Sequence, residues 1–210
     1  MTAYQTIASP ATGTYTEKKS EFIAQLTPVA TIQEAQDFIE SVRKKHYKAR
    51  HNVYAYQIRD PETSKYSDDG EPQGTAGLPI MDVLQKQNLT NICCVVTRYF
   101  GGVLLGANGL VRAYTHSTVA ALEQAQILIM CPCYPVSIYM DYTQYGKIMH
   151  NLSQDQLVIK NTIFTDQVEI QIYVKTEAWP TLQHDLIEWT GNQVQTKLGN
   201  IQYMDFPAQK

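Results

Sequence analysis

The chain has little cysteine, no long apolar run and almost no excess of charge, and each shortage excludes a class of protein. Only 4 of its 210 residues are cysteine, too few for the disulfide framework of a small secreted domain. No apolar run approaches the roughly 20 residues that a membrane-spanning helix needs, and the first residues lack a charged segment leading into an apolar one. The sequence therefore predicts a cytoplasmic protein with free thiols and no membrane segment.

Motifs of common metal and catalytic centres are missing as well. The pairs Cys93-Cys94 and Cys131-Pro132-Cys133 lack the Cys-x-x-Cys spacing of a zinc site, and Cys93 and Cys94 would point to opposite faces of a strand. There is no G-x-S-x-G motif, and no serine or cysteine has an assignable histidine partner. We therefore expect no metal and no cofactor, and no catalytic residue is assigned.

The charges divide unevenly along the chain. The net charge is −3, so no overall field attracts nucleic acid, and DNA is not expected as a partner. Residues 1–133 carry 12 basic and 12 acidic residues, and residues 134–210 carry 5 and 8. Pro132 and Pro135 end the helical pattern before them, which places a domain boundary between residues 133 and 134. The acidic second domain is the poorer candidate for contact with phosphate.

Both domains are predicted to mix helices and strands. In the first domain, strand-like runs at 4–8, 21–27, 52–58 and 92–97 accompany a helix from Thr31, a helix with Pro79 in its first turn, a helix at 110–127 and a polar loop at 60–74. This pattern predicts an α/β sandwich. In the second, strands at 136–140, 156–164, 167–174 and 193–203 alternate with helices at 144–152 and 179–189. The order βαββαβ is typical of a ferredoxin-like sandwich.

The acidic segment 67–77, S-D-D-G-E-P-Q-G-T-A-G, combines three carboxylates with glycines. Asp68, Asp69 and Glu71 are hard oxygen ligands of the kind that Mg²⁺ prefers, but their spacing does not match a calcium-binding loop. The same residues are typical of a turn in which Asp side chains accept backbone hydrogen bonds near the start of a helix. We favour the structural role, and a metal-dependent hydrolase or peptidase is the alternative.

A glycine-rich turn at residues 98–114 joins a predicted strand to a predicted helix. Such a turn often binds phosphate through backbone N–H groups, and Arg98 and Arg112 flank it. The sequence lacks the Lys and Ser or Thr of a nucleotide-binding P-loop. An anion site and simple close packing of the glycines both remain open.

The dense basic segment 43–51 has five cations in nine residues. Cations at the end of a helix complement its dipole, whereas cations beside an aromatic side chain also indicate binding to a phosphate backbone. Both interpretations are kept. The resulting candidates for binding a nucleic acid or another partner are Lys44, Lys45, Lys48, Arg50, His51, Arg98, Tyr99 and Arg112.

The segments 67–77, 95–102 and 106–114 closely resemble the YigZ/IMPACT family, and the resemblance extends over most of residues 15–125. Asn108 departs from the glycine usual in relatives but tolerates a left-handed backbone. The loops that carry the family signature contain Asp68, Asp69, Gly70, Glu71, Pro72, Gly74, Gly101, Gly102, Gly106 and Gly109.

The resemblance implies a fold and a cellular context. The first domain would have the fold of ribosomal protein S5 domain 2, and the second would resemble domain V of elongation factor G. Eukaryotic IMPACT proteins act in a translational stress response, but their kinase pathway is absent from bacteria. We therefore expect a binding protein rather than an enzyme, with RNA, the ribosome or a translation-associated protein as its partner. A pure protein-interaction module is a further alternative.

Overall fold

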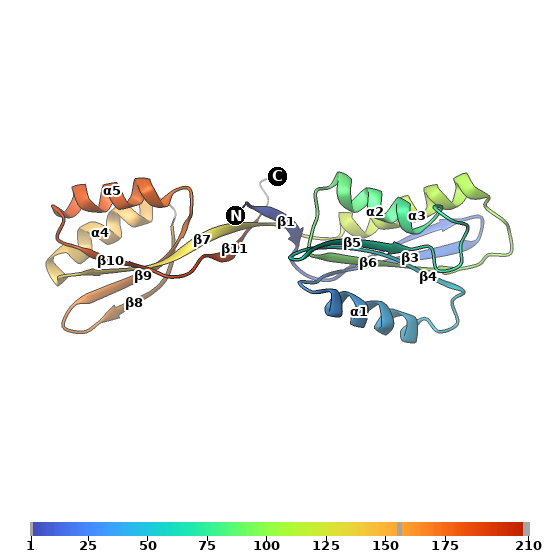
Figure 1. Ribbon diagram of the computed structural model, residues 1–210, viewed down its shortest axis with the longest axis horizontal. Coiled ribbons are helices and arrows are strands. Elements are labelled where there is room, and N and C mark those ends of the chain that lie inside the picture. The colour runs from blue at the N-terminus through green and yellow to red at the C-terminus, as the bar shows by residue number, and fades with distance from the viewer. Residues whose placement is uncertain (1, 155–156, 208–210) are drawn as a thin grey trace. The chain divides into compact units, whose positions relative to one another are not determined.

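The computed structural model describes residues 2–154 and 157–207, which form two compact units (Figure 1). The N-terminal unit comprises Tyr4–Ile129, and the C-terminal unit comprises Met130–Phe206 with the first residues of the chain. The division falls inside strand β7 (Ile127–Met140), which contains both Pro132 and Pro135. The expectation that the two prolines end the preceding helix is wrong, because that helix already ends at Glu123 and both prolines lie inside the strand. The boundary expected after residue 133 lies within the same strand.

The N-terminal unit is built on an antiparallel sheet with the strand order β2-β3-β6-β4-β5. The apolar pattern predicts neither β2 nor β5, because both are edge strands with many exposed side chains; β5 lies where a polar loop is expected. A short strand, β1 (Tyr4–Ile7), pairs with β7 instead. The five strands of the sheet are β2 (Ala11–Glu17), β3 (Ser20–Pro28), β4 (His51–Arg59), β5 (Glu62–Ser67) and β6 (Ile92–Tyr99).

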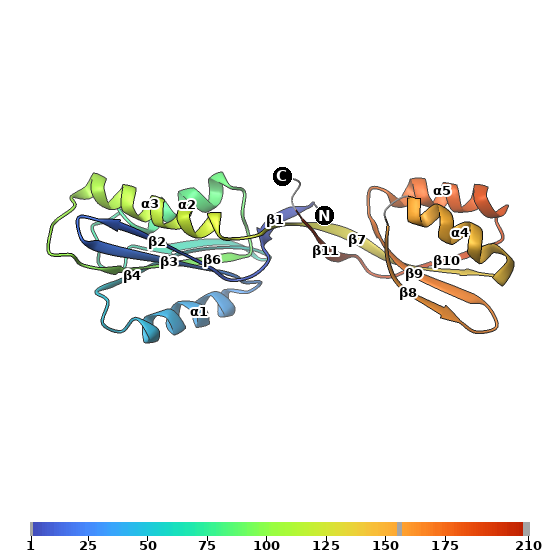
Figure 2. The same ribbon diagram turned by 180° about the vertical axis from the view of Figure 1, so that it is seen from behind.

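Helices cover both faces of this sheet. Helix α1 (Ile32–Lys45) lies on one face, and α2 (Gly77–Lys86) and α3 (Ala107–Glu123) lie on the other (Figures 1 and 2). Helix α3 ends before the expected residue 127, because Ile127 already begins β7. In the described ranges, no helix combines the length and the apolar character needed to cross a membrane.

Two apolar clusters result, one on each face of the sheet. Ile39 and Val42 of α1 pack in the cluster that contains Cys93, whereas Leu84 of α2 packs in the cluster that contains Cys94. The two adjacent cysteines therefore enter different cores, as alternation along a strand predicts. Strand β6, buried on both faces, holds the unit together.

The C-terminal unit has the strand order β10-β7-β9-β8, and β11 also pairs with β7. The order from β7 to β10 is βαββαβ, with β9 between β7 and β8, which confirms the predicted ferredoxin-like arrangement. The expected last strand is divided into two, and the expected strand start at Gln156 lies outside the described residues. The elements after β7 are α4 (Tyr142–Gln154), β8 (Val158–Phe164), β9 (Val168–Lys175), α5 (Trp179–Thr190), β10 (Gln195–Leu198) and β11 (Gln202–Pro207).

Both helices of this unit cover the same face of its sheet (Figure 1). Val136 and Ile138 are buried in the resulting core, whereas the alternate residues Ser137 and Tyr139 are partly exposed. One face of the sheet is therefore open.

Candidate functional site

The segments that the sequence analysis identifies meet at one end of the N-terminal sheet. The antiparallel register places Glu21 opposite Tyr99 and His51 opposite Arg98. The β2–β3 turn, the turn from α1 to β4 and the segment after β6 are therefore at the same end of the sheet. The acidic segment joins them through the contacts of its carboxylates.

Asp68 fixes the beginning of α2. Its Oδ1 accepts the N–H groups of Ala76 at 3.1 Å and Gly77 at 2.8 Å, and its Oδ2 accepts that of Gly74 at 2.9 Å. Ala76 provides no side-chain cap of its own. Asp68 therefore satisfies the unpaired N–H groups of the helix and places a negative charge at the positive end of its dipole.

Asp69 joins the acidic segment to α1 and β4. Arg43 Nη2 donates to its Oδ1 at 2.8 Å, and the N–H of Asn52 donates to its Oδ2 at 2.7 Å. The Nδ1 of His51 lies 2.8 Å from the carbonyl oxygen of Asp69. The backbone φ of Asp69 is positive, 45°. This conformation allows the side chain of Asp69 to accept hydrogen bonds from Arg43 and Asn52 while its carbonyl oxygen contacts His51.

Glu71 and Arg98 form a buried ion pair. Arg98 Nη1 lies 2.6 Å from Glu71 Oε1, to which the Tyr114 hydroxyl also donates at 2.9 Å. The two charged side chains are only 4% and 7% exposed. Burial, and then the charge of Glu71, raise the pKa of Tyr114, which keeps its hydroxyl protonated as a donor. The guanidinium carbon of Arg98 lies 5.4 Å from the ring centre of Phe22 and 5.6 Å from that of Phe100.

The three carboxylates of the acidic segment thus serve three different contacts and do not converge on one point. Each accepts hydrogen bonds from groups of the chain itself, which favours the structural interpretation over a metal-dependent hydrolase. Across the described ranges, the group of three His, Cys, Asp or Glu side chains with donor atoms within 4.8 Å of one another is His184, Asp185 and Glu188 on α5.

A pocket of about 400 Å³ lies where the acidic segment and the glycine-rich turn meet. Phe100 is 50% exposed and Leu104 is 84% exposed, so large apolar groups face solvent here. Exposed apolar side chains grouped beside a pocket make this end of the sheet a candidate contact surface. The pocket is lined by Arg50, His51, Glu71, Pro72, Arg98, Phe100, Leu104, Leu105, Gly106, Ala107 and Leu110.

Gly101 packs segment 100–106 against the β2–β3 turn. A Cβ at Gly101 would lie 2.0 Å from the carbonyl carbon of Lys19, so no other residue fits. The N–H of Gly101 also donates to Ser20 Oγ at 3.0 Å. Lys18 and Lys19 form the two-residue turn, each with positive φ. The sequence pattern does not identify these two lysines as site residues, because only the pairing of β2 with β3 brings them to this end.

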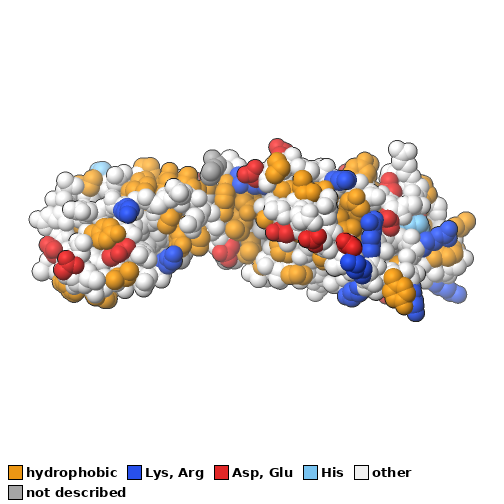
Figure 3. Space-filling view, turned by 60° about the horizontal axis from the view of Figure 1, so that its bottom comes forward, with side chains coloured by type: hydrophobic (Ala, Val, Ile, Leu, Met, Phe, Trp, Pro, Cys, Tyr) orange, Lys and Arg blue, Asp and Glu red, His pale blue; other side chains and the backbone are white. Residues whose placement is uncertain are grey.

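The cations at this end differ in how far they are neutralised. Arg43 is paired with Asp69, and Lys44 is paired with Glu40 at 2.8 Å. Figure 3 shows Lys and Arg side chains gathered toward the right-hand end of the view, with apolar side chains among them. In the β2–β3 turn and in residues 45–50, five exposed cations form no ion pair with a described residue, and we call them the basic rim: Lys18, Lys19, Lys45, Lys48 and Arg50.

Besides Lys44, two of the sequence candidates belong neither to the pocket lining nor to the basic rim. The hydroxyl of Tyr99 is 3.0 Å from His46 Nδ1, which ties the end of β6 to the turn after α1. Burial, and then the charge of Lys45, lower the pKa of His46, so the imidazole is neutral near pH 7. Arg112 is exposed on α3 and does not line the pocket.

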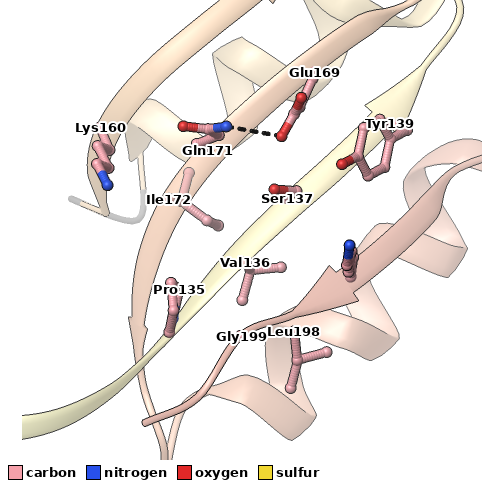
Figure 4. A pocket seen from close by; sticks show the side chains of 11 residues that line it. Pro135, Val136, Ser137, Tyr139, Lys160, Glu169, Gln171, Ile172, Leu198 and Gly199 are labelled. Carbon is pink, nitrogen blue, oxygen red and sulfur yellow. Dashed lines mark hydrogen bonds between the residues drawn. The ribbon is translucent and has the colours of Figure 1, made fainter. Parts of the chain in front are cut away.

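A second hollow, of about 370 Å³, lies on the open face of the C-terminal sheet (Figure 4). Lys160 and Lys197 line it together with Glu169, which accepts a hydrogen bond from Gln171 Nε2 at 2.9 Å. This bond, and a weaker one from Ser137, lower the pKa of Glu169. The acid between the two lysines makes this hollow a weaker candidate for a polyanion than the basic rim.

Both units match families of known proteins. Residues 18–122 match the Impact N-terminal domain, and residues 138–193 match a domain of unknown function, DUF1949. The IMPACT family member YvyE of Bacillus subtilis is 39% identical over 189 residues, which cover 90% of this chain and 87% of that protein. The IMPACT family member YigZ of Escherichia coli is 39% identical over 150 residues, which cover 70% of this chain and 74% of YigZ.

A solved structure described as a crystal structure of an hypothetical protein is similar over nearly the whole length. The similarity covers 95% of this chain and 98% of the solved chain, with 31% identity and a TM-score of 0.61. The pocket and the basic rim lie within the part of the chain that matches the Impact N-terminal domain. The chain therefore belongs to the IMPACT family, as its signature segments predict.

Proposed function

We propose that this chain is a non-enzymatic binding protein that contacts RNA, free or in the ribosome, through the basic rim and the adjacent pocket. The observation that carries the proposal is the convergence of the basic, glycine-rich and acidic segments at one end of a single sheet. Tyr47, 75% exposed, lies among the rim cations, and Lys48 Nζ is 5.7 Å from its ring centre. Cations interleaved with exposed aromatic side chains are typical of surfaces that bind single-stranded nucleic acid.

In this proposal the electrostatic attraction for RNA comes from the basic rim and not from the charge of the whole chain. The whole chain has a net charge of −3, so only a concentrated group of cations can draw a phosphate backbone to it. The context that we propose, from the family resemblance, is the regulation of translation or a stress response coupled to it. Binding of this kind weakens steeply as salt rises, because each neutralised phosphate releases counterions.

The test is co-sedimentation with purified ribosomes, together with direct binding to protein-free ribosomal RNA, across a series of salt concentrations. The double variant Lys45→Glu, Lys48→Glu is compared with Lys65→Glu, Lys86→Glu, which changes the net charge equally. Lys45 and Lys86 each lie in the last turn of a helix, so the two variants are matched in their effect on helix dipoles.

The rim variant is expected to bind more weakly, and its plot of log affinity against log salt should be shallower by about 1.4, at about 0.7 per single-strand phosphate. The control variant should match the parent chain. Binding that is absent at low salt, or that both variants weaken equally, would contradict the proposal.

A second candidate function is docking to a protein. The apolar side chains Val103 and Leu104, 45% and 84% exposed, favour it, because large exposed apolar groups often mark protein contacts. Capture of the same ribosomal proteins after complete ribonuclease digestion, unchanged by the rim substitutions, would favour this candidate over RNA.

A further inference from the structure

The pocket beside the basic rim has the size and the walls of a site for one small apolar group. Its volume is about 400 Å³, within the range of roughly 300–1,000 Å³ usual for small-molecule sites. Phe100, Leu104, Leu105 and Leu110 form apolar walls. Phe100 offers an aromatic ring that is half exposed, and a planar group can stack on such a ring.

Hydrogen-bond donors lie beside these apolar walls. Helix α3 is 17 residues long and begins after Gly106, with no side-chain cap and no acid in its first turn. Its first backbone bond runs from Leu110 N–H to the Gly106 carbonyl, so the amides of residues 107–109 precede the intrahelical ladder. These amides form a positive end that favours an anion.

A buried guanidinium lies in the wall of the pocket. Arg98 lines the pocket and is only 6% exposed. Its Nη1 is held by Glu71, but its Nε is buried without a hydrogen-bond partner among the described residues. A buried donor of this kind is costly unless a ligand or water satisfies it. The pocket thus combines apolar walls with the start of an uncapped helix and an arginine whose hydrogen bonding is incomplete.

One ligand has to account for both the pocket and the basic rim next to it. An apolar peptide end carries a single carboxylate and would leave Lys45 and Lys48 without a role. A single-stranded nucleic acid carries a planar base and a phosphate in every unit, and further phosphates extend along the strand. A base can enter a pocket only when it is unstacked, as in RNA loops and single strands.

We propose that this pocket receives one unstacked base of a single-stranded RNA, with the adjoining phosphate at the N-terminus of α3 and the flanking phosphates on the basic rim. This inference rests on the proposed function and adds a base-binding subsite to it. Phe100 and Leu104 provide the contact with the base, and the amides at the start of α3 provide the contact with the phosphate.

The experiment measures the fluorescence anisotropy of a labelled ten-nucleotide uridylate strand and of the same sugar-phosphate strand without bases. The strand with bases should bind about fivefold or more tightly than the abasic strand, since stacking of one base on an aromatic side chain contributes at least that order of affinity. Phe100→Ala should remove most of this difference and leave the salt slope unchanged. Phe164→Ala is the matched control, because Phe164 is an aromatic residue of similar exposure, 54%, in the C-terminal unit.

Two further variants separate the parts of the site. Leu104→Ser alters a side chain that is almost fully exposed, so the fold is retained, and it should weaken only the strand with bases. Ala107→Pro removes one amide at the first position of α3, where proline is tolerated, and should weaken both strands.

Several outcomes would overturn the inference. Equal affinity for the two strands, with the Lys45→Glu, Lys48→Glu variant still impaired, would leave RNA binding intact and remove the base subsite. Absence of binding to either strand would remove both the proposed function and the subsite. Saturable binding of a tripeptide that ends in phenylalanine, with no binding of RNA, would make the pocket a peptide site.

Discussion

Glu71 and Arg98 place opposite charges in the interior of the N-terminal unit, next to the pocket. A buried ion pair contributes little net stability, because desolvation of both charges offsets their attraction. Removal of one partner is different, since it leaves the other charge buried and unpaired. The pair therefore fixes the position of the acidic segment against β6 more than it stabilises the fold.

At the residue scale, we predict strong coupling between these two side chains. Arg98→Met should destabilise the N-terminal unit by about 3–5 kcal/mol, and the double variant Glu71→Leu, Arg98→Met should recover a large part of that loss. The measurement is urea unfolding followed by circular dichroism in a double-mutant cycle. Additive losses in the double variant would show that the pair is not coupled.

The sequence identifies the charged residues of this site but not their partners. Asp69 is 26 positions from Arg43, and Glu71 is 27 from Arg98 and 43 from Tyr114. No local pattern connects residues so far apart, so the acidic segment is compatible with a metal site as well as with a turn. The local role of Asp68 at a helix start is predictable, but for Asp69 and Glu71 only the tertiary fold settles which donors meet the carboxylate.

The pocket itself shows the same limit of prediction. Glycines at 101 and 106 indicate a tight turn, and this part is predictable. The exposure of Phe100 and Leu104 is not predictable from the sequence, because an apolar residue in a glycine-rich segment is equally consistent with a position in the core. Lys18 and Lys19 reach the site only through the pairing of β2 with β3.

At the scale of elements, α2 and α3 begin in contrasting ways. Asp68 satisfies the start of α2 from nine positions upstream of Gly77, whereas α3 has no side-chain cap. A helix end without a cap is less stable but leaves its amides available for a ligand. Under the proposal made above, the start of α2 has a structural role and the start of α3 has a binding role.

We predict that Asp68→Ala destabilises the N-terminal unit by about 1–2 kcal/mol, because three backbone N–H groups lose their acceptor and the helix dipole loses its negative partner. Asp68→Asn should cost less, since the amide oxygen still accepts hydrogen bonds. Chemical unfolding measures both variants. Asp82→Ala, which alters an exposed residue of the same helix, should change stability by less than about 0.5 kcal/mol, and an equal effect there would refute the role of Asp68.

At the scale of the whole molecule, each unit has its own apolar core. Leu84 belongs to the core of the N-terminal unit, and Ile148 belongs to that of the C-terminal unit. Both tryptophans, Trp179 and Trp189, lie in α5. Tryptophan fluorescence therefore reports on the C-terminal unit alone, whereas far-ultraviolet circular dichroism reports on both.

We predict that Leu84→Ala lowers the stability of the N-terminal unit by about 2–5 kcal/mol through loss of packing, and leaves the fluorescence midpoint where it was. Ile148→Ala should move the fluorescence midpoint instead. Denaturant titrations read by both probes test this. A shift of both probes by Leu84→Ala would mean that the two units unfold as one.

The four cysteines bear on how this protein can be studied. All four thiols are free and buried, and burial raises the pKa of Cys94 to about 12 and also raises those of Cys93 and Cys133. A thiol reacts as its thiolate, so the native cysteines should be slow toward maleimides in the folded chain. A single cysteine introduced by Leu104→Cys would then accept a fluorophore selectively at the mouth of the pocket, and the natural sequence could otherwise be kept intact.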